Sequence, residues 1–187
     1  MPKELNLFAS LIERCVRREE KARRELYELF SKAMYQVCLR YAKDKDQAED
    51  IFQEAFIKVF ENLGKVTEPK ALAGWIKTTF IHTAIDYVRK HSKVQYSEMD
   101  ILQKHSGANE YIVENIIAED IMKMVQKLPV KPRMVFNLYV MEGYNHREIA
   151  EMMEMSEGTS KSLLFDARKI LKEALTKEEE KKMKIVV

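Results

Sequence analysis

Residues 128–175 read LPVKPRMVFNLYVMEGYNHREIAEMMEMSEGTSKSLLFDARKILKEAL, and this stretch decides the fold of the second half of the chain. It contains two helix-start signals, Asn145 and Ser156, and Glu148 stands at the position of a capping-box partner for the first. A short apolar helix is predicted after Asn145, and a helix with a polar face after Ser156. Two helices that begin so close together are typical of a helix-turn-helix, which places its second helix in the major groove of DNA.

The second of these helices is expected to bury Leu163, Ala167 and Ile170, while the small Ala150 lets the first helix approach it closely. Residues early in a recognition helix reach base edges, and flanking Lys, Arg, Ser and Thr hold phosphates. The alternative is an ordinary helical hairpin with a solvated polar face. The residues expected on the open side and in the first turns are Thr159, Ser160, Lys161, Ser162, Phe165 and Arg168.

The composition indicates a globular, helix-rich protein that does not bind DNA through charge alone. Of its 187 residues, 46% are hydrophobic and 33% are charged, and only five are Gly and four are Pro. The net charge is +2, so another component should supply much of any affinity for phosphates. No run approaches the roughly 18 apolar residues of a membrane span, and the first residues show no signal-peptide pattern. We therefore expect a cytoplasmic protein without membrane insertion.

The sequence contains no pattern that predicts catalysis, a metal or a cofactor. Cys15 and Cys38 stand alone within apolar helical patterns, so we expect both to be reduced and partly buried, with a redox or metal role as the alternative. The four histidines are scattered without metal-ligand spacing. A Gly-rich phosphate loop and a nucleophile motif are both missing, so the chain is not expected to be an enzyme.

Helical periodicity also runs through the first half of the chain. Asp46 is expected to cap one of these helices, with Glu49 as its capping-box partner, and Gly64 is expected to end it. Residues 92–120 lose the pattern and carry two Lys against six acids, a net charge of −4, which predicts an acidic linker before a helix restarts near Val113. The predicted helices of the first half span residues 7–18, 23–41, 46–63 and 70–90.

The helix around residues 50–60 carries a polar cluster beside a wide apolar surface. Asp50, Gln53 and Glu54 are spaced i, i+3, i+4 and therefore lie close together on the helix. Apolar residues cover nearly two faces, so this helix is either central to a bundle or covered by a partner. The alternative is a core helix with a solvated acidic edge.

The helix that starts near Trp75 combines aromatic and basic residues. Residues 75–93 hold four Lys or Arg and one Asp, a net charge of +3. Basic residues interleaved with aromatics suit a nucleic-acid surface that captures unstacked bases. Trp75, Ile81 and Ile85 also suit a core helix, so we expect both roles on different faces.

These blocks together resemble the bacterial sigma-70 family of RNA polymerase sigma factors, in its short extracytoplasmic-function (ECF) group. The first block is similar to sigma region 2 and the second to sigma region 4, in the order that the family has them. The matching residues are Leu26-Tyr27, AEDIFQEAF at 48–56, Trp75 and AIDYVRK at 84–90 in the first block, and Leu128-Pro129, Glu142-Gly143, EIAE at 148–151, SEGTSKS at 156–162 and Ala167-Arg168 in the second.

The resemblance implies an all-α protein with two helical domains, a region 2 helical bundle and a region 4 helix-turn-helix, joined by a linker. The expected boundaries are 5–93 for region 2, 94–114 for the acidic linker, 115–176 for region 4, and 177–187 for a tail that frays or extends the last helix. The implied function is to direct core RNA polymerase to specific promoters and initiate transcription. The implied partners are the β′ clamp and β flap of core polymerase, promoter DNA and an anti-sigma factor, which no residue here identifies.

The resemblance also implies roles for individual residues. Asp50, Gln53 and Glu54 match the polar contact with the clamp coiled coil of the β′ subunit. The loop around residues 64–73 and the helix after it match the parts that open and read the −10 element, where a non-template base flips out. The acidic linker matches a segment that runs towards the RNA exit path. The implied −10 residues are Trp75, Lys77, Thr78, His82, Arg89 and Lys90, and the implied −35 residues are Thr159, Ser160, Lys161, Ser162, Phe165, Asp166 and Arg168.

The chain departs from the usual pattern of the family at four positions. Asn is frequent where this chain has His82, Gly is common where it has Glu154, an apolar residue is usual at Ser160, and Arg or another polar contact residue is frequent at Asp166. A left-handed backbone at Glu154 would cost about 1 kcal/mol. The carboxylate of Asp166 would repel phosphate but could accept a hydrogen bond from cytosine N4, which predicts a different −35 preference.

Two other functions stay open from the residues alone. A stand-alone helix-turn-helix regulator would use the first half of the chain for dimerisation or sensing, and would bind duplex DNA without polymerase. An all-helical adaptor that binds only protein would show no dependence on nucleic acid.

Overall fold

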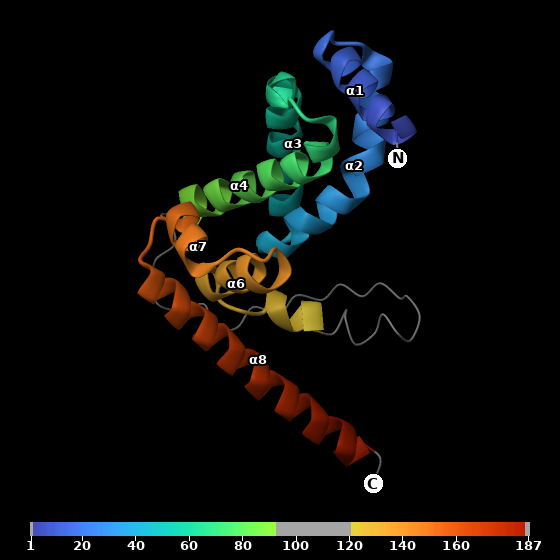
Figure 1. Cartoon of the computed structure of the whole chain (residues 1–187). Coiled ribbons are helices and arrows are strands. Elements are labelled where there is room, and N and C mark those ends of the chain that lie inside the picture. The colour runs from blue at the N-terminus through green and yellow to red at the C-terminus, as the bar shows by residue number, and fades with distance from the viewer. Residues whose placement is uncertain (1, 93–120, 186–187) are drawn as a thin grey trace. The chain divides into compact units, whose positions relative to one another are not determined.

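The computed structural model describes residues 2–92 and 121–185, and contacts divide the chain into two compact units, Met1–Val94 and Gln95–Val187. Figure 1 shows helices in both units, and no strand occurs over the two described ranges. The prediction of an all-α protein is therefore confirmed.

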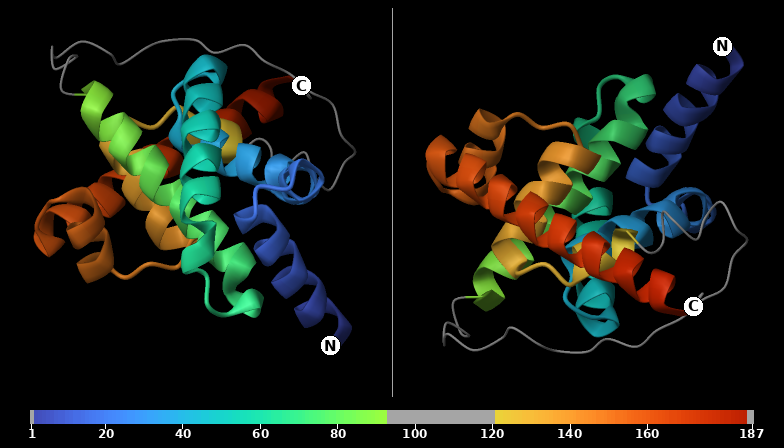
Figure 2. Two further views of the ribbon diagram at one scale, coloured as in Figure 1. Left: turned by 90° about the horizontal axis from the view of Figure 1, so that it is seen from above. Right: turned by 90° about the horizontal axis from the view of Figure 1, so that it is seen from below.

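Over residues 2–92, the first unit comprises α1 (Pro2–Val16), α2 (Glu20–Tyr41), α3 (Lys45–Asn62), the 3₁₀ turns η1 (Leu63–Lys65) and η2 (Pro69–Ala71), and α4 (Leu72–Ser92). Helices α2, α3 and α4 pack against one another, and α1 packs on α2 and on both turns. The left view of Figure 2 shows α4 crossing α3. The core lies between the three long helices, where Leu26, Ile51 and Phe80 are fully buried.

Helix α3 begins and ends differently from its sequence prediction. Asp44 is the N-cap, not Asp46, because the Asp44 carboxylate accepts a hydrogen bond from the backbone N–H of Gln47 at 2.8 Å. Asp46 lies in the first turn instead, where its charge faces the positive end of the helix dipole. At the other end, the chain tightens into η1 and carries Gly64 inside that turn, so Gly64 is not a left-handed stop.

Over residues 121–185, the second unit comprises a helical stretch at 121–126, α6 (Val130–Phe136), the π-helical turn η3 (Asn137–Met141), α7 (His146–Met153) and α8 (Glu157–Ile185). Helix α8, red in Figure 1, packs on α6 and α7. Its Ala167 joins Val125 and Leu128 in one buried cluster, and Leu138 and Ile149 are fully buried as well.

Both helix starts of the predicted helix-turn-helix are confirmed. Asn145 accepts a hydrogen bond from the backbone N–H of Glu148 at 3.0 Å, and Glu148 accepts one from the backbone N–H of Asn145 at 2.8 Å. These two bonds form the capping box. Ser156 accepts a hydrogen bond from the backbone N–H of Thr159 at 3.0 Å and so caps the second helix. The turn between the helices passes through Glu154, which is left-handed at φ 52° and ψ 52°.

The buried side of α8 is rotated relative to the prediction. Leu163 is only half-buried and Ile170 is exposed, although both were expected to pack inward. The prediction counted apolar residues alone, and it therefore missed a fully buried serine at the start of the stripe. The observed stripe, at i, i+4, i+7 and i+11, consists of Ser160, Leu164, Ala167 and the half-buried Leu171.

Predictions were also made for the cysteines, the C-terminal tail, the linker and membrane insertion. Cys15 and Cys38 form no disulfide, as expected, and both are buried. Helix α8 continues to Ile185, so the tail extends the last helix. The acidic linker and the helix restart near Val113 lie outside the described residues. No helix within the described ranges is both long enough and apolar enough to cross a membrane.

We expect Glu154→Gly to stabilise the second unit by about 1 kcal/mol, because glycine adopts this left-handed backbone without steric cost. Thermal unfolding followed by circular dichroism measures the change. The matched control is Glu151→Gly, which also removes one carboxylate but places glycine inside α7, and it should destabilise by about 1 kcal/mol. Shifts of the same sign in both variants would contradict the backbone explanation.

Candidate functional site

A hydrogen bond ties the acidic edge of α3 to α4. Tyr87 of α4 donates its hydroxyl proton to a carboxylate oxygen of Asp50 at 2.7 Å, and its ring stacks on His91 with centroids 4.1 Å apart. This hydrogen bond, with a further contribution from desolvation, raises the pKa of Tyr87 to about 12. Glu54 lies one turn after Asp50 and pairs with Lys58 at 2.8 Å. The sequence singled out Asp50 and Glu54, whereas Tyr87 stood only within the matching stretch AIDYVRK and no role was predicted for it.

An aromatic groove opens between α2 and α3, next to this acidic edge. Tyr27 and Tyr35 of α2 face Phe56 and Phe52 of α3, with ring centroids 4.8 Å and 5.6 Å apart respectively. Gln53 is exposed and lines the same groove. Helix α3 thus contributes a buried stripe to the core and an aromatic stripe at the groove, where Phe52 and Phe60 are half-buried and Phe56 is buried.

We expect the first unit to lose stability as pH rises from the ordinary tyrosine pKa of 10.0 to the pKa of about 12 that Tyr87 has when folded. The folded chain binds the phenolic proton more tightly than the unfolded chain, so the contribution is complete below that window and lost through it. Urea unfolding at several pH values across the window measures this slope. Tyr87→Phe should flatten it, whereas Tyr27→Phe should not. Equal slopes for wild type and Tyr87→Phe would rule out the assignment.

Four of the six residues predicted for the −10 element share one side of α4. Trp75, Thr78, His82 and Arg89 follow one another at i, i+3, i+7 and i+14, and all are exposed or half-buried. Arg89 also pairs with Asp86 at 3.1 Å. The pair is partly exposed, so it holds the guanidinium only weakly.

The remaining two −10 residues lie away from the centre of this face. Lys77 follows Trp75 by two residues, which places it about 200° around the helix, on another side of α4. Lys90 follows Arg89 directly and lies at the edge of the face, where it is exposed. The structure therefore groups four predicted residues and separates two.

Six of the seven residues predicted for the −35 element are exposed on α8. Phe165 is 69% exposed, which is unusual for an aromatic side chain in a packed domain. Lys161 pairs with Glu157 at 3.7 Å across one exposed helical turn. The six exposed residues are Thr159, Lys161, Ser162, Phe165, Asp166 and Arg168.

Ser160 is the exception, because it was expected on the open side of α8 and is buried instead. Its side chain is fully buried, and its hydroxyl lies 2.9 Å from Nδ1 of His146. The His146 ring stacks on Tyr139 with centroids 4.6 Å apart, and the Arg168 guanidinium lies 5.8 Å from the centroid of the same Tyr139 ring. Sequence reasoning missed His146 and Tyr139. The available signal was a serine at a position that is usually apolar, because a buried hydroxyl needs a partner.

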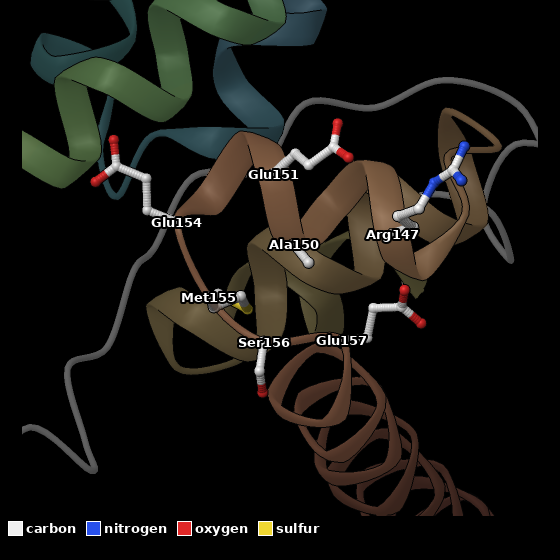
Figure 3. A pocket seen from close by; sticks show the side chains of 7 residues that line it. All are labelled: Arg147, Ala150, Glu151, Glu154, Met155, Ser156 and Glu157. Carbon is white, nitrogen blue, oxygen red and sulfur yellow. The ribbon is translucent and has the colours of Figure 1, made fainter.

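A shallow pocket lies at the turn of the helix-turn-helix (Figure 3). Its lining includes Glu151, Glu154 and Glu157, whose carboxylates point in different directions. These groups do not converge on a common point. Nor do any three His, Cys, Asp or Glu side chains come together as a metal site anywhere in the described part of the chain. The pocket is a shallow surface depression at the turn between α7 and α8.

Comparisons with known proteins cover both units. Residues 26–94 match the family model for sigma-70 region 2, and residues 118–171 match the model for sigma-70, region 4. The ECF RNA polymerase sigma factor SigM of Bacillus subtilis (strain 168) is 31% identical over 152 residues, which cover 79% of this chain and 91% of SigM. The ECF RNA polymerase sigma-E factor of Escherichia coli (strain K12) is 27% identical over 173 residues, covering 86% of this chain and 90% of the relative.

Among solved structures, CnrH in complex with the cytosolic domain of CnrY aligns with a TM-score of 0.48 at 15% identity, over 89% of this chain and 95% of that chain. The two family-model matches contain the acidic edge of α3, the exposed face of α4 and the exposed face of α8.

Proposed function

The chain belongs to the sigma-70 family of RNA polymerase sigma factors, in its ECF group, and from this premise we propose how its surfaces divide the work of promoter recognition. As a member of this family, it directs core RNA polymerase to promoters and initiates transcription. The observation that carries this conclusion is the presence of both region 2 and region 4 in one chain, because a stand-alone helix-turn-helix regulator needs only the second. We place region 2 at 5–93, the linker at 94–114, region 4 at 115–176 and the tail at 177–187.

We assign the acidic edge of α3 to the β′ clamp of core polymerase. Gln53 is exposed beside the aromatic groove, so an incoming helix could bury apolar side chains there while Gln53 forms hydrogen bonds at the rim. Glu54 can exchange its partly exposed pairing with Lys58 for a cation of the partner at little cost. Asp50 is exposed, and Tyr87 donates a hydrogen bond to one of its two carboxylate oxygens.

The exposed face of α4 is assigned to the −10 element. A base that leaves the duplex loses a few kcal/mol of stacking, and aromatic side chains next to cations can repay it. Trp75 and His82 supply rings on one side of α4, and Arg89 supplies a cation on the same side. Lys77 and Lys90 lie away from the centre of this face, and we expect them to contact phosphates instead of the captured base.

The exposed face of α8 is assigned to the −35 element. Thr159 and Ser162 lie in the first turns, where a recognition helix reaches base edges, and Lys161 and Arg168 are placed to hold phosphates. The net charge of +2 suits this division of labour, because core polymerase supplies the remaining affinity. A second polymerase contact, with the β flap, would use apolar side chains exposed on η3.

We also propose that an anti-sigma factor holds the chain inactive in the cytoplasm, where core polymerase acts. The support is that two apolar surfaces are exposed in the free chain. The aromatic groove of the first unit and the exposed Phe165 of the second are apolar surfaces that a stored protein would need to cover.

The test is transcription in vitro with bacterial core polymerase on a pool of genomic promoters, with and without this chain. New, discrete start sites that appear only with the chain are the expected result. Binding of duplex DNA by the chain alone, without new start sites, would instead favour a stand-alone regulator. Comparing the DNA upstream of the new start sites then gives the −10 and −35 sequences.

A further inference from the structure

We propose that His146 is a positioning residue for promoter recognition, which orients Arg168 through the ring of Tyr139 and anchors the start of α8 through Ser160. His146 itself is half-buried at the first position of α7 and reaches both groups from there. The proposal rests on the assignment of α8 to the −35 element. It adds a set of contacts inside the helix-turn-helix that orients the exposed Arg168 side chain.

The first contact of His146 fixes the rotation of α8. Ser160 begins the buried stripe, and its hydroxyl has His146 Nδ1 at 2.9 Å as its side-chain partner. A buried hydroxyl that loses its partner is costly, so the pairing favours one rotation of α8 about its axis. The exposed residues of the first turns, among them Thr159 and Ser162, then face away from α7.

The second contact of His146 reaches an exposed cation. The His146 and Tyr139 rings lie 25° from parallel with centroids 4.6 Å apart, and the Arg168 guanidinium lies over Tyr139 at 5.8 Å. Tyr139 is itself 36% exposed, so without His146 behind it the ring would have several orientations. The stack therefore narrows the range of positions that the long Arg168 side chain occupies before DNA arrives.

Restricting the Arg168 side chain before DNA arrives matters because a flexible arginine loses side-chain entropy when it binds a phosphate. Arg168 lies on the same side of α8 as Lys161 and Phe165, at i, i+4 and i+7. A guanidinium already held on that side contacts DNA beside these two residues and loses less side-chain entropy on binding. His146 would thus raise −35 binding without touching DNA.

Two double variants separate the stack from the hydrogen bond. Both carry Ser160→Ala, which removes the buried hydroxyl, and they differ only at residue 146. His146→Phe keeps an aromatic ring behind Tyr139, whereas His146→Leu removes it. Circular dichroism melts check that the two proteins are equally folded. Each chain is bound to core polymerase, and transcription is compared on promoter DNA that contains the −35 duplex and on DNA that ends between the two elements.

The ratio of the two transcript yields is the −35 advantage. We expect the Ser160→Ala/His146→Phe variant to keep this advantage within about twofold of wild type, and the Ser160→Ala/His146→Leu variant to lose about fivefold. Adding Arg168→Ala should cost about fivefold in the phenylalanine background and almost nothing in the leucine background.

Equal advantages for the two pairs, or an equal cost of Arg168→Ala in both backgrounds, would overturn the role of His146 while leaving the assignment of α8 intact. If the wild-type chain shows transcription but no −35 advantage, the assignment of α8 is wrong, and the role of His146 is wrong with it.

Discussion

Replacing Gln53 and Glu54 together by alanine is expected to weaken binding to core polymerase at least about tenfold and to remove the transcripts that depend on this chain. Gln53 lines the aromatic groove, and Glu54 lies one turn after the carboxylate that Tyr87 holds, so both polar side chains belong to the surface assigned to the β′ clamp. Truncation there leaves partner groups without hydrogen bonds after they have been removed from water. The loss should therefore exceed that of an exposed ion pair, which contributes about 1 kcal/mol or less.

The matched control for this variant is Glu61→Ala, which removes an exposed carboxylate from the far end of the same helix. Fluorescence anisotropy of the labelled chain titrated with core polymerase gives Kd for wild type, the Gln53/Glu54 variant and the control. Thermal melts of the three proteins show whether α3 still folds. A Kd for the double variant equal to that of Glu61→Ala would place the polymerase contact elsewhere on the first unit.

The helix-turn-helix could be predicted from the sequence because its signals are local. A capping box needs only Asn145 and Glu148, three residues apart, and both hydrogen bonds are present. Glu154, by contrast, was singled out only by the resemblance, because glycine is common at this position, and its backbone is left-handed. The misplaced cap of α3 shows the limit of such signals. Asp44 and Asp46 both stand near the start of the helix, and the backbone decides that Asp44 caps it while Asp46 lies in the first turn.

The contacts that organise the candidate surfaces could not be predicted in this way. Tyr87 bonds to Asp50 across 37 positions, and His146 bonds to Ser160 across 14, so no helical period relates either pair. Hydrophobic periodicity also assigns polar residues to the surface by default. Ser160 was therefore expected at the DNA face, although its partner makes burial acceptable. The same error rotated the expected buried side of α8 by part of a turn.

The two exposed sides of α8 differ in charge, and this difference leads to the second large effect. Lys161, Phe165 and Arg168 form one side, at i, i+4 and i+7. Thr159, Ser162 and Asp166 form the other side, at i, i+3 and i+7, and here the acidic residue is exposed. A carboxylate among hydroxyls avoids phosphates but can accept a hydrogen bond from the N4 amino group of cytosine. Asp166 is thus better suited to a base than to the backbone.

We expect Asp166→Arg to change the preferred base at one −35 position from cytosine to guanine, with a preference that shifts about tenfold or more. The guanidinium would donate two hydrogen bonds to O6 and N7 of guanine, where the carboxylate had accepted one from cytosine. Transcription from a promoter library randomised across the −35 element, followed by sequencing of the transcripts, measures the preference. Asp166→Asn keeps the size and loses the charge, so it should relax the cytosine preference without creating one for guanine.

The pattern across the library separates two physical roles of residue 166. If Asp166→Arg strengthens all −35 sequences alike, the new cation meets a phosphate, since phosphate contacts carry no sequence information. An unchanged base preference would show that residue 166 does not contact the base edges. A shift confined to one position would instead fix the register of α8 in the major groove. Ser162 and Thr159, exposed one and two turns earlier, would then read the neighbouring bases.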